Sequence, residues 1–469
     1  MVTIITLEHM INKNEIDTKA KEFEISQTNV EKDYVFGWLL HGIFTVSNLK
    51  DIIFLKGGNA LRKGYFEQTR FSSDLDFGIP YDIAQDKLLE EINGVCDFIS
   101  LKSGVHFIKE GVKIEEKFTV SESPLPDLRV FEVKIYFKDF YGMGDHIRLK
   151  IAMDITRFDK VLLPIQTVEL IHPYSDADII SCNIRCVKLE EIIATKLKCL
   201  MQRQHAPDLF DYVNSIKLLG GKLNKKEVVE TFISKTIFGR NPHVLKGILH
   251  KTPFDHFRSY WTKTIICAKT IIFQVEEAIN LFQQDLENLF VFFPDNGFAQ
   301  FVYFNADLRV PILEAGRRQT LLKIRYKGEE RMVEPYALKY MQRRDGQQFE
   351  YFYAFNRSGG SNAPGMRTLV ASNFQSIEVT DEKFAPQYPI ELSKAGETPE
   401  DRYLFDPSKP TRPRSSKNKS HRMKYIYQCS VCGKKFSKVK SDSTLGVHKN
   451  KNGYKCGGRR GIYVTSKYP

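Results

Sequence analysis

The sequence predicts a mixed α/β core that is followed by a helical bundle, a small β-barrel-like domain and a short cysteine-containing module. Three observations support this order. Strand-like and helix-like patterns alternate before residue 160, helical periodicity runs from 189 to 293, and short strand-like runs separated by turns fill 297–390. At about 100–200 residues per domain, 469 residues accommodate several domains. The boundaries that we predict are 1–187, 188–296, 297–395, a basic linker over 396–423, and 424–469.

The predicted core alternates amphipathic helices with short strands that end in glycine. In chain order, its elements are a helix over Val30–Val46, a strand over Ile52–Leu55 leading into Gly57-Gly58, a helix over Ala60–Gln68, a strand over Leu75–Phe77, and alternating strands over Phe131–Phe137 and Ile147–Ile155. Long strands interleaved with helices favour a mixed sheet.

The following region has the periodicity of packed helices, and the region after it has that of antiparallel strands. The predicted helices are Glu190–Gln202, Pro207–Leu219, Lys225–Lys235, His243–His250 and Thr270–Phe293. The predicted strands are Thr320–Tyr326, Phe349–Phe355 and Thr368–Ser372, with turns at 327–328, 345–346 and 358–360. We therefore expect a helical bundle against the core, then a small β domain.

Composition excludes a membrane-spanning or disulfide-scaffolded protein. Apolar residues make up 42% and charged residues 27%, as in ordinary globular proteins. No apolar run approaches the roughly 20 residues that span a bilayer, and the N-terminus lacks the pattern of a secretory signal. Eight cysteines in so long a chain do not indicate a disulfide framework. We expect a cytoplasmic protein.

Positive charge is concentrated near the C-terminus. Residues 407–469 hold 17 Lys and Arg against one acid, Asp442, whereas the rest holds 52 basic and 56 acidic residues. A basic tail usually binds a polyanion, most often nucleic acid. The alternative is a solvated end that only aids solubility.

The segment 54–77 combines a glycine turn with a pair of acids. Two glycines after a strand let backbone N–H groups approach a phosphate closely. Asp74 and Asp76 are two apart in an extended segment, so both side chains leave the same face. A third acid, Asp154, ends another strand. Three acids from neighbouring strands predict a site for Mg²⁺, with two ions, that transfers phosphoryl groups.

These segments resemble a known family. Lys-Gly-Gly-Asn-Ala-Leu at 56–61 and Arg-Phe-Ser-Ser-Asp-Leu-Asp-Phe at 70–77 are similar to AbiEii/AbiGii-type toxins, which belong to the nucleotidyltransferase superfamily with the DNA polymerase β-like fold. The helical stretch from Glu190 to Asp211 resembles the downstream motifs of the family. The resemblance spans roughly residues 25–220.

The resemblance implies a role for each matching residue. Asp74, Asp76 and Asp154 would hold Mg²⁺, with Asp154 acting as a base or orienting the acceptor, and Lys196 would face the triphosphate. The residues implied to bind the nucleotide are Lys56, Gly57, Gly58, Asn59, Ser72, Arg203 and Asp208, and Asp211 completes the last motif as a catalytic residue. Two positions depart from the family: Asn59 replaces a hydroxyl residue but retains a hydrogen-bond donor, and Pro207 replaces a basic residue.

Residues 306–390 resemble a WYL domain, a small β fold associated with sensing in bacterial defence proteins. The similar pieces are 324–328, 331–338, 351–355, Arg367 and 377–384, although Tyr351-Phe352-Tyr353 stands where the Trp-Tyr-Leu signature would be. The resemblance implies that Tyr353 and Arg367 belong to a pocket for a nucleotide or oligonucleotide. The alternative is a β module whose aromatic residues are mostly core.

The last module has the spacing of a structural zinc site. Cys429 and Cys432 form a CxxC pair, and His448 and Cys456 follow at distances that suit a tetrahedral Zn²⁺. Four protein ligands leave no open coordination position, so we expect the metal to be structural. Lysines and arginines around the site, together with Phe436 and Tyr454, favour nucleic acid as the partner.

The leading hypothesis is a Mg²⁺-dependent nucleotidyltransferase toxin of a bacterial toxin–antitoxin or phage-defence system. The resemblance implies that it moves a nucleoside monophosphate from an NTP to a tRNA 3′ end and blocks translation, and that a cognate antitoxin exists. One alternative is a ligand-sensing nucleic-acid-binding regulator on an inactive nucleotidyltransferase scaffold. Another keeps the enzyme but changes the acceptor to a protein or a nucleotide.

Overall fold

The structure is a computed structural model that describes residues 11–467 with internal gaps. The gaps are 109–110, 119–128, 141–147, 204, 237, 239–241, 294–302, 343–347, 359–363, 389, 391, 393–423, 439–441 and 450–454. The predicted linker over 396–423, the turn at 345–346, most of the turn at 358–360, and Tyr454 lie outside the described residues. The chain divides into two compact units, Met1–Leu404 and Phe405–Pro469, which are described separately.

A seven-stranded mixed sheet forms the centre of the first unit, in the order β3-β4-β5-β2-β1-β7-β6. Its strands are β1 (Phe54–Lys56), β2 (Asp74–Gly78), β3 (Lys113–Phe118), β4 (Arg129–Lys138), β5 (Arg148–Thr156), β6 (Gln166–Glu169) and β7 (Asn183–Cys186). The pairs β2/β5 and β1/β7 are parallel and the others are antiparallel. The central strands β2 and β5 alternate buried apolar residues with half-buried polar ones, which gives the sheet one core face and one polar face.

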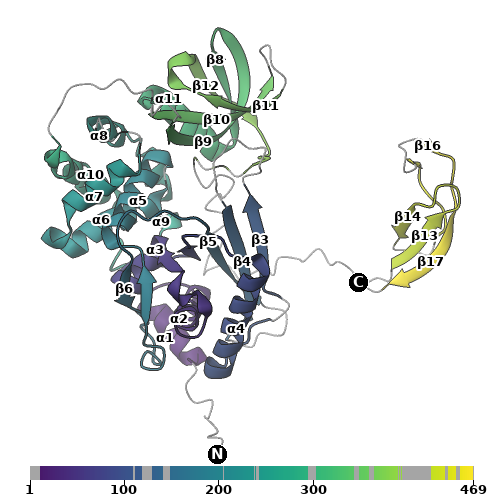
Figure 1. Cartoon of the computed structure of the whole chain (residues 1–469), viewed down its shortest axis with the longest axis horizontal. Helices are drawn as coiled ribbons and strands as arrows, with labels where there is room; N and C mark the ends of the chain where they lie inside the picture. The colour runs from purple at the N-terminus through teal and green to yellow at the C-terminus, as the bar shows by residue number, and fades with distance from the viewer. Residues whose placement is uncertain are drawn as a thin grey trace, which may run out of the picture. The chain divides into compact units, whose positions relative to one another are not determined.

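Helices α1 (Lys13–Glu22), α2 (Gln27–Thr45) and α4 (Gln85–Ser103) belong to the same apolar core as this sheet (Figure 1). The Ser26 hydroxyl caps α2 by accepting from the Asn29 N–H. α2 is buried over most of its length and packs against α4, β5 and β7. The predicted helix over Val30–Val46 is therefore present, but α1 and α4 were not predicted.

The chain turns directly from β1 into a helix at Gly57, three residues earlier than predicted. The turn is α3 (Gly57–Ala60), which continues into a π-helical segment over Leu61–Tyr65. The predicted helix over Ala60–Gln68 is wrong at both ends, because the backbone is already extended at Phe66. Because the helix begins at Gly57, directly after β1, the turn packs beside β2.

Residues 189–293 are largely helical and contribute a second apolar core. The helices are α5 (Leu189–Gln202), α6 (Ala206–Leu219), α7 (Lys225–Ser234), α8 (Pro242–His250), α9 (Asp255–Thr264) and α10 (Val275–Leu289). α9 was not predicted, and α10 starts later than the predicted Thr270. Trp261 of α9 is buried and donates its indole N–H to the Phe273 carbonyl. The segment for which no helix was predicted is therefore part of this core.

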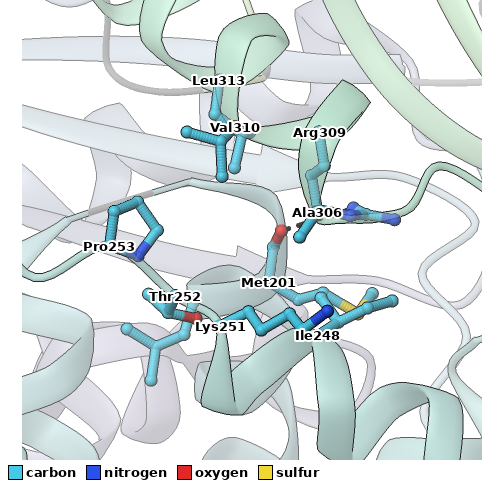
Figure 2. A pocket seen from close by; sticks show the side chains of 10 residues that line it. Met201, Ile248, Lys251, Thr252, Pro253, Ala306, Arg309, Val310 and Leu313 are labelled. Carbon is cyan, nitrogen blue, oxygen red and sulfur yellow. Dashed lines mark hydrogen bonds between the residues drawn. The ribbon is translucent and has the colours of Figure 1, made fainter.

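A five-stranded antiparallel sheet follows, in the order β11-β10-β9-β8-β12, with α11 (Ala306–Arg318) packed on it. Its strands are β8 (Thr320–Tyr326), β9 (Glu329–Gln342), β10 (Gln348–Ser358), β11 (Gly365–Leu369) and β12 (Phe374–Lys383). The Arg309 guanidinium is buried and donates to both Glu350 carboxylate oxygens, at 2.6 and 2.5 Å. Arg309 also borders a small pocket between α5, α8 and α11, where it donates to the Met201 carbonyl (Figure 2). The resemblance of this region to a WYL domain stays a prediction.

The second unit contains a three-stranded sheet and a two-stranded ribbon. The sheet order is β14-β13-β17, formed by β13 (Lys424–Cys429), β14 (Lys435–Lys438) and β17 (Gly461–Lys467), and the ribbon pairs β15 (His448–Lys449) with β16 (Lys455–Cys456). Across both units, no described helix is long and apolar enough to span a membrane.

Candidate active site

Three carboxylates meet on the polar face of the central sheet. Asp74 and Asp76 are half-buried on β2, whereas Leu75 and Phe77 between and beyond them are fully buried on the core face. Asp154 of β5 lies directly opposite Asp76 in the parallel register. Neighbouring strands are about 4.8 Å apart, so the three side chains share one small surface. The structure therefore brings together the acids that the sequence predicted.

This surface suits a hard divalent cation. Carboxylate oxygens are the ligands that Mg²⁺ prefers, and half-buried acids leave room for water and substrate phosphates in the remaining coordination positions. Asp74, Asp76 and Asp154 are the residues that would hold the metal, and its charge would offset their mutual repulsion.

The row of polar residues continues beyond the predicted acids. Glu132 of β4 pairs with Asp154 in register, and Lys56 of β1 pairs with Asp76. Glu132 forms an ion pair with Lys134 at 3.2 Å, which partly neutralises it. Glu132 was missed, although its place between the buried Phe131 and Val133 was a usable signal. Lys56 is engaged within the site, because its Nζ donates to Thr156 Oγ1 at 2.9 Å and to Asp159.

The glycine turn packs directly against the acids. Gly57 has φ +70°, and a Cβ at this position would lie 2.3 Å from Asp76 Oδ2. A Cβ at Gly58 would lie 2.8 Å from Arg70 Nη2 and 2.9 Å from Ser72 Oγ. Gly57 therefore requires glycine for its backbone conformation as well as for close approach, and Gly58 requires it for close approach. The predicted role of the turn in phosphate binding stays a prediction.

Asn59 forms a hydrogen bond with the strand next to the turn, β2. Its side chain is fully buried, and Nδ2 donates to the Asp74 carbonyl at 2.5 Å. The amide predicted to replace the hydroxyl of the family is thus committed to holding β2, so it does not face an open phosphate site. Ser72 Oγ lies 3.4 Å from Asp74 Oδ1 and orients that carboxylate.

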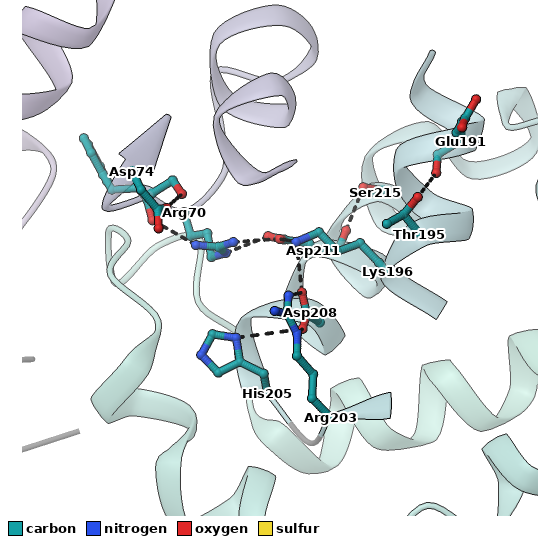
Figure 3. Close-up of polar contacts among 12 residues, drawn as sticks. Arg70, Asp74, Glu191, Thr195, Lys196, Arg203, His205, Asp208, Asp211 and Ser215 are labelled. Carbon is teal, nitrogen blue, oxygen red and sulfur yellow. Dashed lines mark hydrogen bonds and ion pairs between the residues drawn. The ribbon is translucent and has the colours of Figure 1, made fainter. Parts of the chain in front are cut away.

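The residues of the downstream motifs form a buried ion-pair network (Figure 3). Lys196 Nζ of α5 lies 3.0 Å from Asp208 Oδ1 and 2.7 Å from Asp211 Oδ2, both on α6. The Arg203 guanidinium donates to Asp208 at 2.8 and 3.1 Å. Arg70, just before β2, donates to both Asp211 oxygens at 2.7 Å. Figure 3 shows Arg70 lying between Asp74 and Asp211, so it links the surface that carries the three acids to this network.

Burial makes the network strongly coupled. Asp208 and Asp211 are each about 1% exposed. Burial alone would raise the pKa of Asp208, but Arg203 and Lys196 outweigh it and hold that pKa well below its usual range. Burial would lower the pKa of Lys196, but Asp211 and Asp208 raise it above its ordinary value. Lys196 is therefore a buried, paired cation that fixes α5 to α6, and the open position facing a triphosphate does not fit this placement.

The C-terminal unit brings Cys429, Cys432, His448 and Cys456 together, with all ligand atoms within 4.8 Å of one another. The Cys429 and Cys456 sulfurs are 3.8 Å apart. A tetrahedron with Zn–S bonds of about 2.3 Å has edges of about 3.8 Å, so the spacing fits Zn²⁺. His448 Nδ1 lies 2.9 Å from the Gly446 carbonyl, and a hydrogen bond donated there leaves Nε2 for the metal.

Local packing supports thiolate ligands at this site. Backbone N–H groups of Cys432 and Val431 lower the pKa of Cys429 to about 6 against a smaller opposing effect of burial. A Cβ at Gly458 would lie 2.3 Å from Cys429 Sγ, so the turn after Cys456 requires glycine. These four residues would hold the predicted structural zinc.

The predicted ligand residues of the β domain lie differently from expectation. Tyr353 is 1% exposed and packs with Ala337, Tyr351 and Met366, and burial raises its pKa to about 12. Its ring is therefore enclosed by its neighbours, and the stacking role that the resemblance implies stays a prediction. Arg367 is half-buried on β11 and donates to the Met366 carbonyl at 3.1 Å.

Comparisons with known proteins concern the region that contains the first of these sites. Residues 38–262, a little under half of the chain, match the family model described as nucleotidyl transferase AbiEii toxin, type IV TA system. Among solved structures, the chain is similar to MenT4, a nucleotidyltransferase toxin from Mycobacterium tuberculosis H37Rv, with 16% identity and a TM-score of 0.41 over 60% of this chain and 90% of that one. No curated protein matches the chain in sequence.

Proposed function

We propose, from the match of residues 38–262 to the AbiEii nucleotidyl transferase toxin model, that the chain is a Mg²⁺-dependent toxin that transfers a nucleoside monophosphate from an NTP to the 3′ hydroxyl of a tRNA. Blocking that hydroxyl prevents aminoacylation and stops translation. The family belongs to type IV toxin–antitoxin systems, and the proposal includes a cognate antitoxin protein.

The observation that carries the proposal is the register of two strands. Asp76 and Asp154 are 78 positions apart in the sequence, yet they are direct neighbours across β2 and β5, and Asp74 shares their face. Such a cluster repels itself unless cations neutralise it. Without a bound cation, the repulsion among the three carboxylates would destabilise the fold, whereas an enzyme can use them to bind metal ions.

In the proposed reaction, the acceptor oxygen forms a bond to the α-phosphorus, and the bond from that phosphorus to the bridging oxygen of pyrophosphate breaks. Bound Mg²⁺ would supply Lewis-acid stabilisation of the phosphate charge. Asp154 orients the acceptor hydroxyl and accepts its proton, while Asp74 and Asp76 fix the triphosphate side. The close approach of Gly57 to Asp76 keeps the carboxylate in one position.

The zinc-binding unit supports the choice of RNA. It is strongly basic, with 17 Lys and Arg against one acid over residues 407–469. A basic appendage gives general affinity for phosphates without sequence readout. Its proposed role is to raise the local concentration of RNA near the enzyme.

The test is a transfer assay with purified chain, Mg²⁺, total RNA and each labelled NTP in turn. We expect label on a tRNA-sized band with wild type and none with Asp76→Asn or Asp154→Asn. Asp178→Asn, an exposed aspartate of the same domain, is the matched control and keeps full activity. Transfer by Asp76→Asn at the wild-type rate would contradict the site.

The same assay separates the two alternatives. A regulator on an inactive scaffold would leave RNA unlabelled and bind duplex DNA through its basic unit. An enzyme with another acceptor would label itself, an added protein or a nucleotide. The intact set of Asp74, Asp76 and Asp154 favours an enzyme over the regulator, because a scaffold would have no need of all three.

A further inference from the structure

The polar face of the sheet carries a strip of positive charge next to the three acids. On β4 and β5 the side chains that share the face of Asp154 alternate with buried apolar residues, and the same face continues onto β3. The basic residues of this strip are Lys113, Lys134, Lys138, Arg148 and Lys150. We call this set the basic strip.

Register places the basic strip in line with the catalytic surface. Lys134 lies opposite Ala152, the residue that pairs with Asp74 on the other side. Lys150 and Arg148 are four and six residues before Asp154 on β5, or about 13 and 20 Å along the strand. The strip therefore starts beside the acids and runs away from them.

Most of this charge is accessible and uncompensated. Lys113, Arg148 and Lys150 are exposed, and none of the three forms an ion pair within the described part of the chain. Lys134 pairs with Glu115 at 2.9 Å and with Glu132 at 3.2 Å, and Lys138 is also engaged. Lys134 thereby neutralises acids that would otherwise repel a polyanion.

The electrostatic reach of the basic strip extends to the acids. Lys32 of α2 is half-buried, and its pKa is lowered first by burial and then by repulsion from Lys150, while attraction to Asp74 opposes both. Lys32, Lys150 and Asp74 therefore lie within electrostatic range of one another. A phosphate near Asp74 would be attracted by both lysines.

We propose that the basic strip is the track along which the acceptor RNA strand lies, with its phosphates on Lys113, Arg148 and Lys150 and its 3′ end at Asp154. This inference rests on the proposed function and adds where the acceptor binds. A nucleic-acid strand has about one phosphate per 3.4 Å along a duplex axis, so a strip of 13–20 Å accommodates several phosphates. An acidic protein would also match the positive charge of the strip, but the three carboxylates next to the strip would repel it, and it has no 3′ hydroxyl to place at Asp154.

The test uses the full-length chain with Arg148→Gln/Lys150→Gln. The matched control is Lys50→Gln/Lys102→Gln, which removes two exposed lysines of η1 (Asn48–Asp51) and α4. We expect the KM for tRNA to rise about tenfold in the strip variant, and the salt slope of kcat/KM to fall by about 1.4, since each phosphate contact on a single strand contributes about 0.7. The kcat at saturating RNA and the KM for NTP stay within twofold of wild type, as does the control variant.

Photo-crosslinking of 4-thiouridine-labelled tRNA provides a readout that needs no activity. We expect crosslinked peptides from β4 and β5 in wild type, and their loss in the strip variant but not in the control. Crosslinks confined to the C-terminal unit, or an unchanged KM in the strip variant, would overturn the track. Competition by polyglutamate as strong as that by RNA would overturn it in favour of an acidic protein. Crosslinks on β4 and β5 without any transfer by wild type would leave the track standing and refute the proposed reaction.

Discussion

Replacing Asp208 by Asn tests whether the buried network holds the catalytic core to the helical region. Asp208 accepts from Lys196 at 3.0 Å and from Arg203 at 2.8 and 3.1 Å, and it is 1% exposed. Asp208→Asn keeps the shape of the side chain but removes its charge. Lys196 then retains only Asp211, while Arg203 loses its carboxylate partner.

The expected loss of stability follows from this geometry. Removing one partner of a buried pair costs about 3–5 kcal/mol. The Arg203 side chain is 27% exposed and Lys196 keeps Asp211, so both cations are partly compensated and the lower value, about 3 kcal/mol, is expected. For a cooperative unit of about 150–250 residues this lowers Tm by about 6–12 °C.

Thermal unfolding as a function of pH is the assay. Because the pKa of Asp208 is held well below its usual range, its charge stabilises the fold above about pH 4, the ordinary pKa of Asp, and this contribution is lost as pH falls further. The difference in Tm between wild type and Asp208→Asn is therefore largest at pH 7 and shrinks below pH 4. Asp381→Asn, which removes a 99% exposed partner of Arg318, is the control and shifts Tm by less than 2 °C. A change of that small size in Asp208→Asn at pH 7 would refute the reasoning.

Three other variants probe the remaining structural claims. Gly57→Ala is expected to lose about 1–2 kcal/mol from its positive φ and to reduce transfer about 100-fold, because the new Cβ would lie 2.3 Å from Asp76 Oδ2; Tm and the transfer rate report the two effects. Cys432→Ser is expected to reduce bound zinc from one ion per chain to none, measured by elemental analysis, and to open the C-terminal unit to proteolysis; retained stoichiometric zinc would contradict the ligand set. Tyr353→Ala is expected to cost about 3–5 kcal/mol as a core truncation, measured by denaturant unfolding, whereas a loss of less than 1 kcal/mol would restore a surface role.

Strand periodicity was enough to predict that Asp74 and Asp76 share one face of the sheet, whereas their catalytic role stays a prediction. Asp74 and Asp76 stand two apart around the buried Leu75, so an extended backbone is enough to place them on one face. Asp154 required the further assumption that its strand neighbours the strand of Asp74 and Asp76, and the β2/β5 pairing agrees with that assumption. Glu132 was missed: its place between two apolar residues of a strand was a usable signal, but its neighbour Asp154 becomes evident only from the β4/β5 register.

The predictions that did not fit concern polar residues whose partners are distant in sequence. The resemblance implies that Lys196 faces a triphosphate, but its Nζ is paired with Asp208 and Asp211 from the next helix. Asn59 looked like a donor at an open turn, but its partner is the Asp74 carbonyl, 15 residues away. Tyr353 lies between the buried Phe352 and Ala354 on β10, and its own face is covered by residues from β9 and β11. The residue type showed which interactions each side chain can form, but the packing of the folded chain determines which groups it contacts.

Arg70 explains why the sheet and the helices α5 and α6 act as one unit. Its guanidinium holds Asp211 through two hydrogen bonds of 2.7 Å, and Nη2 leaves only enough room for a glycine at position 58. Figure 3 places the same side chain next to Asp74. The glycine turn, the first acid of β2 and the motif on α6 therefore meet at one residue. This contact crosses from the first apolar core to the second, and the family match over residues 38–262 contains all of its members. Two neighbouring carboxylates need a rigid support, and the buried network reaches them through Arg70.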